Sequence, residues 1–281
     1  MGRYDMADWK ATKLQKKLIK QVLNSGRLTY GDKTRELEQK FAEIHGHKHA
    51  LFTSSGTSAL KIAINALKDK HGWQDGDEVI IPAVTFVATM NVVLMNNLKP
   101  VLVDVEKTTV NIDPKLIEKA ITPKTRAIIA VHLLGRPADM KAVMKIARKH
   151  KLKVIEDSCE TMFVPVKPRG DVTCYSSYVA HLMVTGVGGF IATDDSKLAT
   201  VMRSMMFHGR DDSYLNIDDK PKNIAKRFYF PRFGYSDRMT ELEAAIGLGE
   251  LENWKEMITK RQAHAINLLV RLYNLPIEFP F

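Results

Sequence analysis

The chain has 281 residues, of which 45% are hydrophobic and 26% charged, and its formal net charge is +10. These values exclude a disordered or fibrous chain and leave room for one large or two medium globular domains. The positive charge favours anionic partners in general, but no motif that reads DNA or RNA accompanies it. A small anionic substrate fits equally well, and nucleic acid is not the expected partner.

The longest apolar run, residues 79–98, contains Pro82, two threonines and three asparagines, which indicates strand, turn and helix rather than a membrane span. The N-terminal sequence MGRYDMADWK lacks an apolar stretch, so no signal peptide is expected. The two cysteines, Cys159 and Cys174, do not have the spacing of a metal site. These features predict a cytoplasmic protein without a metal site or a membrane contact.

The first 47 residues have the pattern of two helices. Apolar residues recur at helical spacing over 10–23 and again after residue 32, with a break at 26–31. Asp32 is the expected cap of the second helix, and Gly46 is its expected end.

A short strand is expected at 49–53, and it runs directly into Ser54-Ser55-Gly56-Thr57 and a helical pattern from Ser58. A strand, a hydroxyl-rich turn and a helix N-terminus form a potential anion site, because free backbone N–H groups and the helix dipole converge there. A plain N-cap explains the same residues equally well.

Strands and helices then alternate. Strands are expected at 78–81, 101–105, 127–131 and 154–155, and helices at 86–97, 113–120 and after Asp139. This alternation predicts an α/β fold with a mostly parallel sheet and helices on both faces. Ligands bind at the carboxyl ends of such strands, and Thr57, Asp157 and Ser176 all fall there, which is the main argument for a single site.

The stretch 171–189, DVTCYSSYVAHLMVTGVGG, predicts a strand that ends in Ser176-Ser177 and a turn that carries His181. A glycine-rich return then leads into the apolar strand Phe190–Thr193. Glycine lets backbone N–H groups approach an anion closely, so this stretch is a candidate seat for a phosphate or a cofactor. Two glycines before a strand are also typical of an ordinary turn.

The last part of the chain is expected to be mainly helical. A helix runs through Phe207, and the polar loop His208–Lys226 follows it. The pattern Thr240-x-x-Glu243 is a capping box, which predicts one long helix from there to about Tyr273.

Together these stretches resemble the DegT/DnrJ/EryC1/StrS family of pyridoxal-phosphate-dependent sugar aminotransferases and dehydratases. The matching segments follow the family's order along nearly the whole chain and include GRLTYGDKTRELEQKFAEIHG, SSGTSAL, GDEVIIPAVTFVATMN, VIEDSCE, TGVGGF and FGYSDRMTELEAAIGLGEL. The resemblance implies the type I aminotransferase fold. It places a large cofactor-binding α/β domain over 1–235, with a helical segment at 1–47. Residues 236–281 would form a long helix leading to a reduced or missing small domain.

The resemblance also implies which residues hold the cofactor phosphate. Gly56 and Thr57 match the family's phosphate-binding turn at a helix N-terminus, and Ser176 matches the hydroxyl that completes the phosphate site. The cofactor would be pyridoxal 5'-phosphate or pyridoxamine 5'-phosphate.

Three further residues match positions around the cofactor ring. Phe86 matches the aromatic residue that stacks on the ring, although a phenylalanine without this motif is by default a core residue. Asp157 matches the carboxylate that pairs with the pyridinium nitrogen and so keeps the ring an electron sink. Glu160 stands beside the ring hydroxyl, where the family usually has Gln.

His181 is the first departure from the family pattern, because the aminotransferases carry their cofactor-binding lysine at this position. No lysine lies between Lys167 and Lys197, and a histidine cannot form an imine. The pattern resembles the family's sugar 3-dehydratases, in which the cofactor stays non-covalent and the imidazole acts as general base. The alternative is a loss of function.

Ser236 is the second departure, since many members have an asparagine there that reaches the phosphate of the neighbouring subunit. The resemblance nevertheless implies a homodimer with the site at the subunit interface.

Three hypotheses follow. The leading one is a dehydratase that acts on a nucleotide-linked 4-keto-6-deoxy sugar. The second is an aminotransferase-like protein that uses a lysine from a partner or from a distant part of the chain. The third is a non-catalytic protein that retains cofactor or nucleotide-sugar binding.

Overall fold

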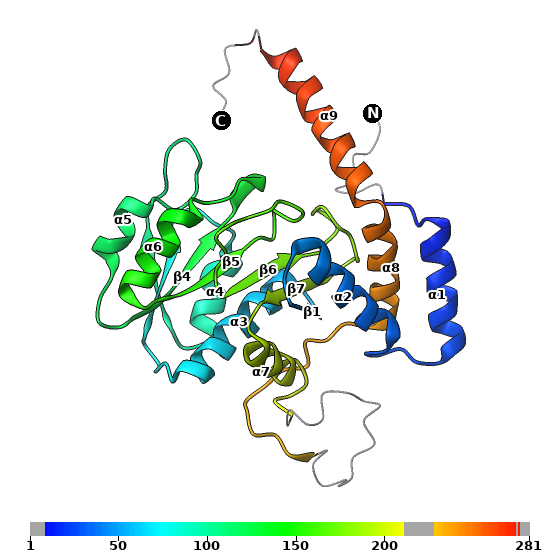
Figure 1. Ribbon diagram of the computed structural model, residues 1–281, viewed down its shortest axis with the longest axis horizontal. Coiled ribbons are helices and arrows are strands. Elements are labelled where there is room, and N and C mark those ends of the chain that lie inside the picture. Colours follow the sequence, from blue (N-terminus) through cyan, green and yellow to red (C-terminus); the bar gives the residue numbers. More distant parts are fainter. Residues whose placement is uncertain (1–8, 211–227, 274, 276–281) are drawn as a thin grey trace.

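Seven strands form one sheet in the order β1-β7-β6-β5-β4-β2-β3. The computed structural model describes residues 9–210, 228–273 and 275 (Figure 1). Strand β7 runs antiparallel to both of its neighbours, and all other neighbouring pairs are parallel, which confirms the predicted sheet. The strands are β1 (His49–Thr53), β2 (Glu78–Pro82), β3 (Lys99–Val103), β4 (Thr125–Val131), β5 (Lys153–Asp157), β6 (Val172–Ser176) and β7 (Gly189–Thr193).

Helices cover both faces of the sheet, as predicted. The helices are α1 (Lys13–Ser25), α2 (Asp32–His45), α3 (Gly56–His71), α4 (Val87–Met95), α5 (Pro114–Ala120), α6 (Met140–His150), α7 (Ser196–Met206), α8 (Glu241–Glu252) and α9 (Trp254–Leu272), with a short 3₁₀ turn at Leu133–Gly135. One face packs against α3, α4 and α7. The other face packs against α5 and α6 at one end and against α2 and α8 at the other.

The central strands are buried on both sides because each face has its own layer of helices. In β2, Val79 and Ile81 join the core beneath α3 and α4, whereas Ile80 between them joins the core beneath α5 and α6. All three are fully buried. Continuous apolar runs of this kind are typical of parallel strands covered on both faces.

A buried carboxylate joins the N-terminal and C-terminal helices. Glu241, the first residue of α8, accepts hydrogen bonds from the backbone N–H groups of Gly31 (2.7 Å), Lys33 (2.9 Å) and Thr34 (3.0 Å), and from the Thr34 hydroxyl. The prediction that Asp32 caps α2 was wrong, because Gly31 is the N-cap residue and Asp32 is the first residue of the helix. Glu241 supplies the missing cap, since the N–H groups of a first helical turn have no partner within the helix.

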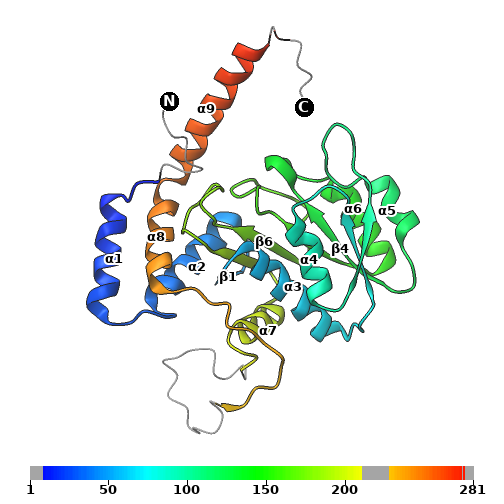
Figure 2. The same ribbon diagram turned by 180° about the vertical axis from the view of Figure 1, so that it is seen from behind.

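Helix α1 lies alongside α8 at the edge of the fold (Figure 2). Thr12 and Gln15 form a reciprocal capping box at its start. The Gln15 side chain also donates to the carbonyl of Ile246 in α8, at 3.1 Å. The N-terminal helix is therefore fixed to the C-terminal part of the chain by a buried polar contact.

The long helix predicted from Thr240 is interrupted. Thr240 is the N-cap of α8 as expected, but Asn253 has non-helical backbone angles and separates α8 from α9. Helix α9 begins with Trp254 stacked on Phe163, at 4.8 Å between ring centroids, and then projects away from the rest of the fold (Figure 1). Its residues 259–270 are all exposed.

Two sequence predictions concern parts that the structure does not decide. The polar loop was expected at His208–Lys226. All of it after position 210 lies outside the described residues. The domain boundary between residues 235 and 236 stays a prediction. Among the described helices, none combines the length and the apolar character needed to cross a membrane.

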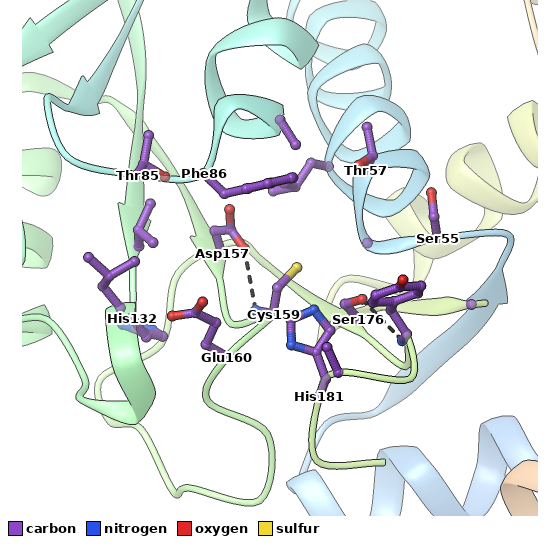
Figure 3. A pocket seen from close by; sticks show the side chains of 18 of the residues that line it. Ser55, Thr57, Thr85, Phe86, His132, Asp157, Cys159, Glu160, Ser176 and His181 are labelled. Carbon is purple, nitrogen blue, oxygen red and sulfur yellow. Dashed lines mark hydrogen bonds between the residues drawn. The ribbon is translucent and has the colours of Figure 1, made fainter. Parts of the chain in front are cut away.

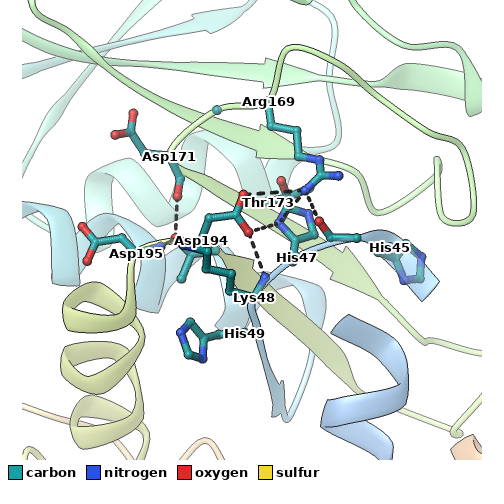
Figure 4. Close-up of polar contacts among 12 residues, drawn as sticks. His45, His47, Lys48, His49, Arg169, Asp171, Thr173, Asp194 and Asp195 are labelled. Carbon is teal, nitrogen blue, oxygen red and sulfur yellow. Dashed lines mark hydrogen bonds and ion pairs between the residues drawn. The ribbon is translucent and has the colours of Figure 1, made fainter. Parts of the chain in front are cut away.

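His45 and His47 lie close together beside the sheet, where the turn after α2 meets the loop before β6 (Figure 4). The ring of His45 donates through Nδ1 to the carbonyl of Phe41 (2.9 Å) and accepts through Nε2 from the N–H of Phe163 (3.2 Å). Burial lowers the pKa of His45 to about 4, and the nearby charges of His47 and Arg169 act in the same direction. Because Nε2 already faces a donor, a second proton has no acceptor there.

We predict that Glu241→Gln lowers the free energy of unfolding by about 2–3 kcal/mol, because an amide loses the charge-assisted bonds and turns an NH₂ group toward backbone donors. Urea unfolding at neutral pH measures this loss. Glu252→Gln, an exposed position at the end of the same helix, is the matched control and should stay within about 0.5 kcal/mol of wild type. Equal stability of the two variants would refute the role of Glu241 as the cap of α2.

We also predict that His45 makes the fold sensitive to acid. Between its folded pKa of about 4 and the unfolded value of 6.5, the unfolded chain binds more protons, so stability falls as the pH falls. His45→Phe keeps the ring stacking but removes this titration. From about pH 7.5 to about pH 5, wild type should lose about 2 kcal/mol more unfolding free energy than His45→Phe. Equal losses in urea titrations at the two pH values would contradict this assignment.

Candidate active site

A cavity of about 440 Å³ lies at the carboxyl edge of the sheet (Figure 3). Seven of the eight residues predicted for the site line it: Gly56, Thr57, Phe86, Asp157, Glu160, Ser176 and His181. The sheet brings them together from four separate stretches of the chain.

Strand register explains why these stretches meet. Gly189 at the start of β7 pairs with Thr53 at the end of β1 and with Ser176 at the end of β6. Asp157 at the end of β5 pairs with Cys174 in β6. The antiparallel strand β7 thus joins the ends of β1 and β6, and the turns that follow these strand ends open into one cavity.

The start of α3 forms an anion-binding end of the cavity. Ser55 is the N-cap and accepts from the N–H of Ser58 at 3.0 Å, and the first intrahelical bond runs from Ala59 to Ser55 at 2.9 Å. The N–H groups of Gly56 and Thr57 precede that bond and have no acceptor within the helix. Together with the helix dipole they favour a bound anion.

Two glycines allow this turn to approach the sheet closely. A Cβ atom on Gly56 would lie 2.7 Å from the sulfur of Cys159 and 2.9 Å from the Cβ of Ser176. A Cβ atom on Gly189 would lie 2.5 Å from the carbonyl of Ser55. All three distances are shorter than real Cβ contacts, so the anion-binding end requires glycine at both positions.

Asp157 presents a fixed carboxylate to the cavity. The residue is buried, and its Oδ2 accepts from the hydroxyl of Thr89 in α4 at 2.9 Å. Its Oδ1 accepts from the N–H of Cys159 at 3.3 Å. The hydroxyls of Thr85 and Thr89 are in turn 2.7 Å apart. These contacts orient an acceptor toward any cation that enters the cavity.

Phe86 supplies a flat apolar wall. It is the N-cap residue of α4, and 72% of its surface is exposed. A phenylalanine that served the core would be buried, so the alternative of core packing does not apply to it. Its exposed ring lines the same cavity as Asp157.

His181 lies in the loop between β6 and β7 and is partly buried. Its backbone N–H donates to the carbonyl of Tyr178 (2.9 Å), and its own carbonyl accepts from Arg261 in α9 (3.4 Å). Burial lowers the pKa of His181 below its usual value of 6.5, while the charges of Glu160 and Asp157 oppose this shift. At neutral pH the imidazole is therefore mainly uncharged and can accept a proton.

Glu160 is exposed on the wall of the cavity. Its Oε2 accepts from the backbone N–H of Leu134 at 2.7 Å. Ser236, by contrast, lies away from the cavity. It is exposed, forms an isolated bridge with Phe207, and accepts from Arg238 at 3.0 Å.

Several residues that the sequence analysis did not select also line the cavity, among them Thr85, His132, Cys159 and Tyr178. His132 directly follows β4. The rule that ligands bind at the carboxyl ends of parallel strands selected Asp157 and could have found His132 in the same way. Cys159 carries no such signal. Burial and the charge of Asp157 raise the pKa of its thiol, which stays protonated.

The cavity residues fit pyridoxal phosphate. The cofactor carries a phosphate, a flat ring and a ring nitrogen that is protonated when it acts as an electron sink. The start of α3 supplies donors for the phosphate, Phe86 supplies a surface for stacking, and Asp157 supplies an acceptor for the nitrogen.

Comparisons with known proteins identify relatives along the whole described fold. The model of the DegT/DnrJ/EryC1/StrS aminotransferase family matches residues 10–280. The spore coat polysaccharide biosynthesis protein SpsC of Bacillus subtilis is 35% identical over 92% of this chain and 66% of its own length. GDP-perosamine synthase of Caulobacter vibrioides is 38% identical over 81% of this chain and 58% of its own length. The chain thus spans about two thirds or less of these two relatives.

Solved structures of similar fold include both transferases and a dehydratase. GDP-4-keto-6-deoxy-D-mannose-3-dehydratase of E. coli, with bound hydrated pyridoxal phosphate, superposes with a TM-score of 0.87 at 30% identity, covering 98% of this chain and 74% of its own. An aminotransferase from Psychrobacter cryohalolentis gives 0.85 at 33% identity, covering 94% and 67%. The predicted type I aminotransferase fold is confirmed, and the chain belongs to the DegT/DnrJ/EryC1/StrS aminotransferase family.

Proposed function

We propose that the protein is a pyridoxal- or pyridoxamine-phosphate-dependent enzyme that removes the 3-hydroxyl group of a nucleotide-linked 4-keto-6-deoxy sugar. The observation that carries this proposal is the identity of residue 181. Of the described residues that line the cavity, none is a lysine, and the family resemblance places His181 at the position where transferases attach the cofactor. The similarity to the E. coli dehydratase supports the proposal.

The residues of the cavity would hold the cofactor without a covalent bond. Gly56, Thr57 and Ser176 would bind its phosphate, Phe86 would stack on its ring, and Asp157 would keep its nitrogen protonated. The bound cofactor supplies an electron sink that stabilises negative charge next to the reacting carbon.

His181 would accept the proton whose removal starts the reaction. An imidazole can do this only when it is uncharged, and its lowered pKa keeps it uncharged at neutral pH. Burial lowers the pKa of this base, and the charges of Glu160 and Asp157 oppose part of that effect.

We further propose that the protein is a homodimer. Exposed apolar side chains surround the entrance to the cavity and continue over α4: Phe86, Val87, Leu94, Met95, Tyr178 and Val187. A second subunit would cover this surface and bring its segment 233–238, with Ser236 and Arg238, toward the phosphate end.

The division into domains is also a proposal. Residues 1–235 would form the cofactor-binding domain, and residues 236–281 would lead into a small domain. The exposed outer half of α9, with Ile266 at 62% and Val270 at 69% exposure, has the apolar character of a helix that another element covers.

The first prediction from this proposal concerns His181. His181→Asn should retain cofactor binding and lose turnover of the sugar by about 100- to 10,000-fold, the usual contribution of a positioned general base. His181→Lys should attach the cofactor covalently, because a primary amine then stands in the cavity. Absorbance and mass spectrometry with and without borohydride measure attachment, and His181→Asn is the control without an amine. Wild-type protein that borohydride links to the cofactor would favour a transferase with another lysine, and full turnover by His181→Asn would refute the proposal.

The second prediction concerns assembly. Light scattering should give a mass of twice the 31.8 kDa of the chain. Leu94→Glu, which places a charge on the outer face of α4, should yield monomers with weakened cofactor binding. Leu23→Glu on α1, a position of similar exposure, is the control and should stay dimeric. A wild-type monomer that binds the cofactor tightly would overturn the dimer.

A further inference from the structure

The loop that carries His181 is not part of any helix or strand. Residues 177–188 connect β6 to β7, and no ladder of backbone hydrogen bonds runs along them. His181 lies in the middle of this loop, four residues after Ser177 and four residues before Thr185. The place of its imidazole in the cavity (Figure 3) therefore depends on the contacts that hold the loop.

The side chains of Ser177 and Thr185 join the two ends of the loop. Their hydroxyl oxygens are 2.6 Å apart, and the Thr185 hydroxyl donates to the carbonyl of Val187 at 2.9 Å. Because this bond uses the Thr185 proton, the Ser177 hydroxyl is the donor within the pair. Two backbone bonds close the same ring: the N–H of Thr185 donates to the carbonyl of Ser177, and the N–H of Ser177 donates to the carbonyl of Gly188, both at 2.9 Å.

The Ser177–Thr185 pair is buried directly behind a wall of the cavity. Ser177 is 0% exposed and Thr185 is 1% exposed. A Cβ atom on Gly188, which lines the cavity, would lie 2.5 Å from each of the two hydroxyl oxygens. A buried hydroxyl that loses its partner has no water to replace it, so each of the two depends on the other. Neither side chain lines the cavity itself, so the pair acts on the cavity through the loop.

Each half of the loop has a further anchor between the pair and His181. In the first half, the N–H of His181 donates to the carbonyl of Tyr178 at 2.9 Å, and Tyr178 forms an isolated bridge with Gly186. In the second half, the side chain of Met183 is buried in the core between α2 and α8. A displacement of the Ser177–Thr185 pair would therefore reach His181 from both sides.

We propose that the Ser177–Thr185 pair positions residue 181 in the cavity by fixing the base of its loop. The inference rests on the proposed function only for the reaction that His181 performs, because the hydrogen bonds belong to the free protein. Two substitutions separate the parts of Thr185. Thr185→Val keeps the shape and removes the hydroxyl, whereas Thr185→Ser keeps the hydroxyl and removes the methyl group, which lies 3.1 Å from where a Cβ atom on Gly247 of α8 would stand.

The first experiment uses His181→Lys, in which the rate of covalent attachment to saturating pyridoxal phosphate reports how well position 181 is held. Adding Thr185→Val should slow attachment by roughly 10- to 100-fold, since a displacement of about 1 Å can cost about 100-fold. Adding Thr185→Ser should leave most of the rate. Absorbance in the visible range follows attachment. Equal rates with Thr185→Val and Thr185→Ser would overturn the proposal, and so would a His181→Lys protein that never attaches, because residue 181 would then not face the cofactor.

Cofactor affinity distinguishes positioning from a general weakening of the site. Added to His181→Asn, which cannot attach the cofactor, Thr185→Val should leave the Kd of pyridoxal phosphate unchanged. A Kd that rises in step with the loss of rate would assign the pair a merely structural role. Ser177→Ala, which leaves Thr185 its bond to Val187, is the second variant in case Thr185→Val does not fold. It should also slow attachment in His181→Lys, and an unchanged rate would contradict the proposal.

Turnover of the sugar tests the same pair in the proposed reaction. With His181 in place, Thr185→Val should lower kcat by roughly 10-fold or more and leave KM near the wild-type value, and Thr185→Ser should recover most of kcat. A raised KM with an unchanged kcat would refute the positioning role. If attachment responds as expected but wild type does not turn over the sugar, the proposed function fails and the positioning of residue 181 stands.

Discussion

The site depends on the close contact between β7 and the turn that starts α3. Gly189 pairs with the last residues of β1 and β6 at once, and its missing side chain lets the carbonyl of Ser55 lie 2.5 Å from where a Cβ atom would stand. This contact fixes the anion-binding end of the cavity relative to Ser176. A larger residue would separate the two strand ends, and the N–H groups of Gly56 and Thr57 would then face solvent rather than a cavity.

The two carboxylates of the cavity have different surroundings, and this difference gives them different uses. Asp157 is buried and has a described donor on each oxygen, so its orientation is fixed. A carboxylate held in this way can pair with one cationic group in the cavity. Glu160 is exposed and has one described donor, so its free oxygen can respond to a change of charge beside it. Environment separates chemically similar groups in this way in many active sites.

The rule that ligands bind at the carboxyl ends of parallel strands predicted several residues of the cavity from the sequence. Asp157 and Ser176 end apolar runs and Thr57 follows one, and parallel strands bring such positions to one edge. The rule could also have selected His132. It could not predict the position of β7 between β1 and β6, because the pattern of apolar residues does not encode strand order. Nor could it show that Glu241 caps α2, since that contact joins residues 210 positions apart. The break at Asn253 was missed because the helical pattern continues across it.

The surroundings of residue 181 suit a histidine better than a lysine. Burial favours the uncharged form of either side chain. The ordinary pKa of a lysine, however, lies about four units above that of a histidine, so a lysine needs a far larger shift of its pKa to become neutral at pH 7. A carboxylate beside it would hold an ammonium group in its charged form. For an imidazole the same carboxylate only offsets part of the effect of burial, which leaves a base that titrates nearer neutrality. The negative charge at position 160 therefore agrees with a histidine at position 181, in a cavity whose remaining residues would serve the cofactor in either case.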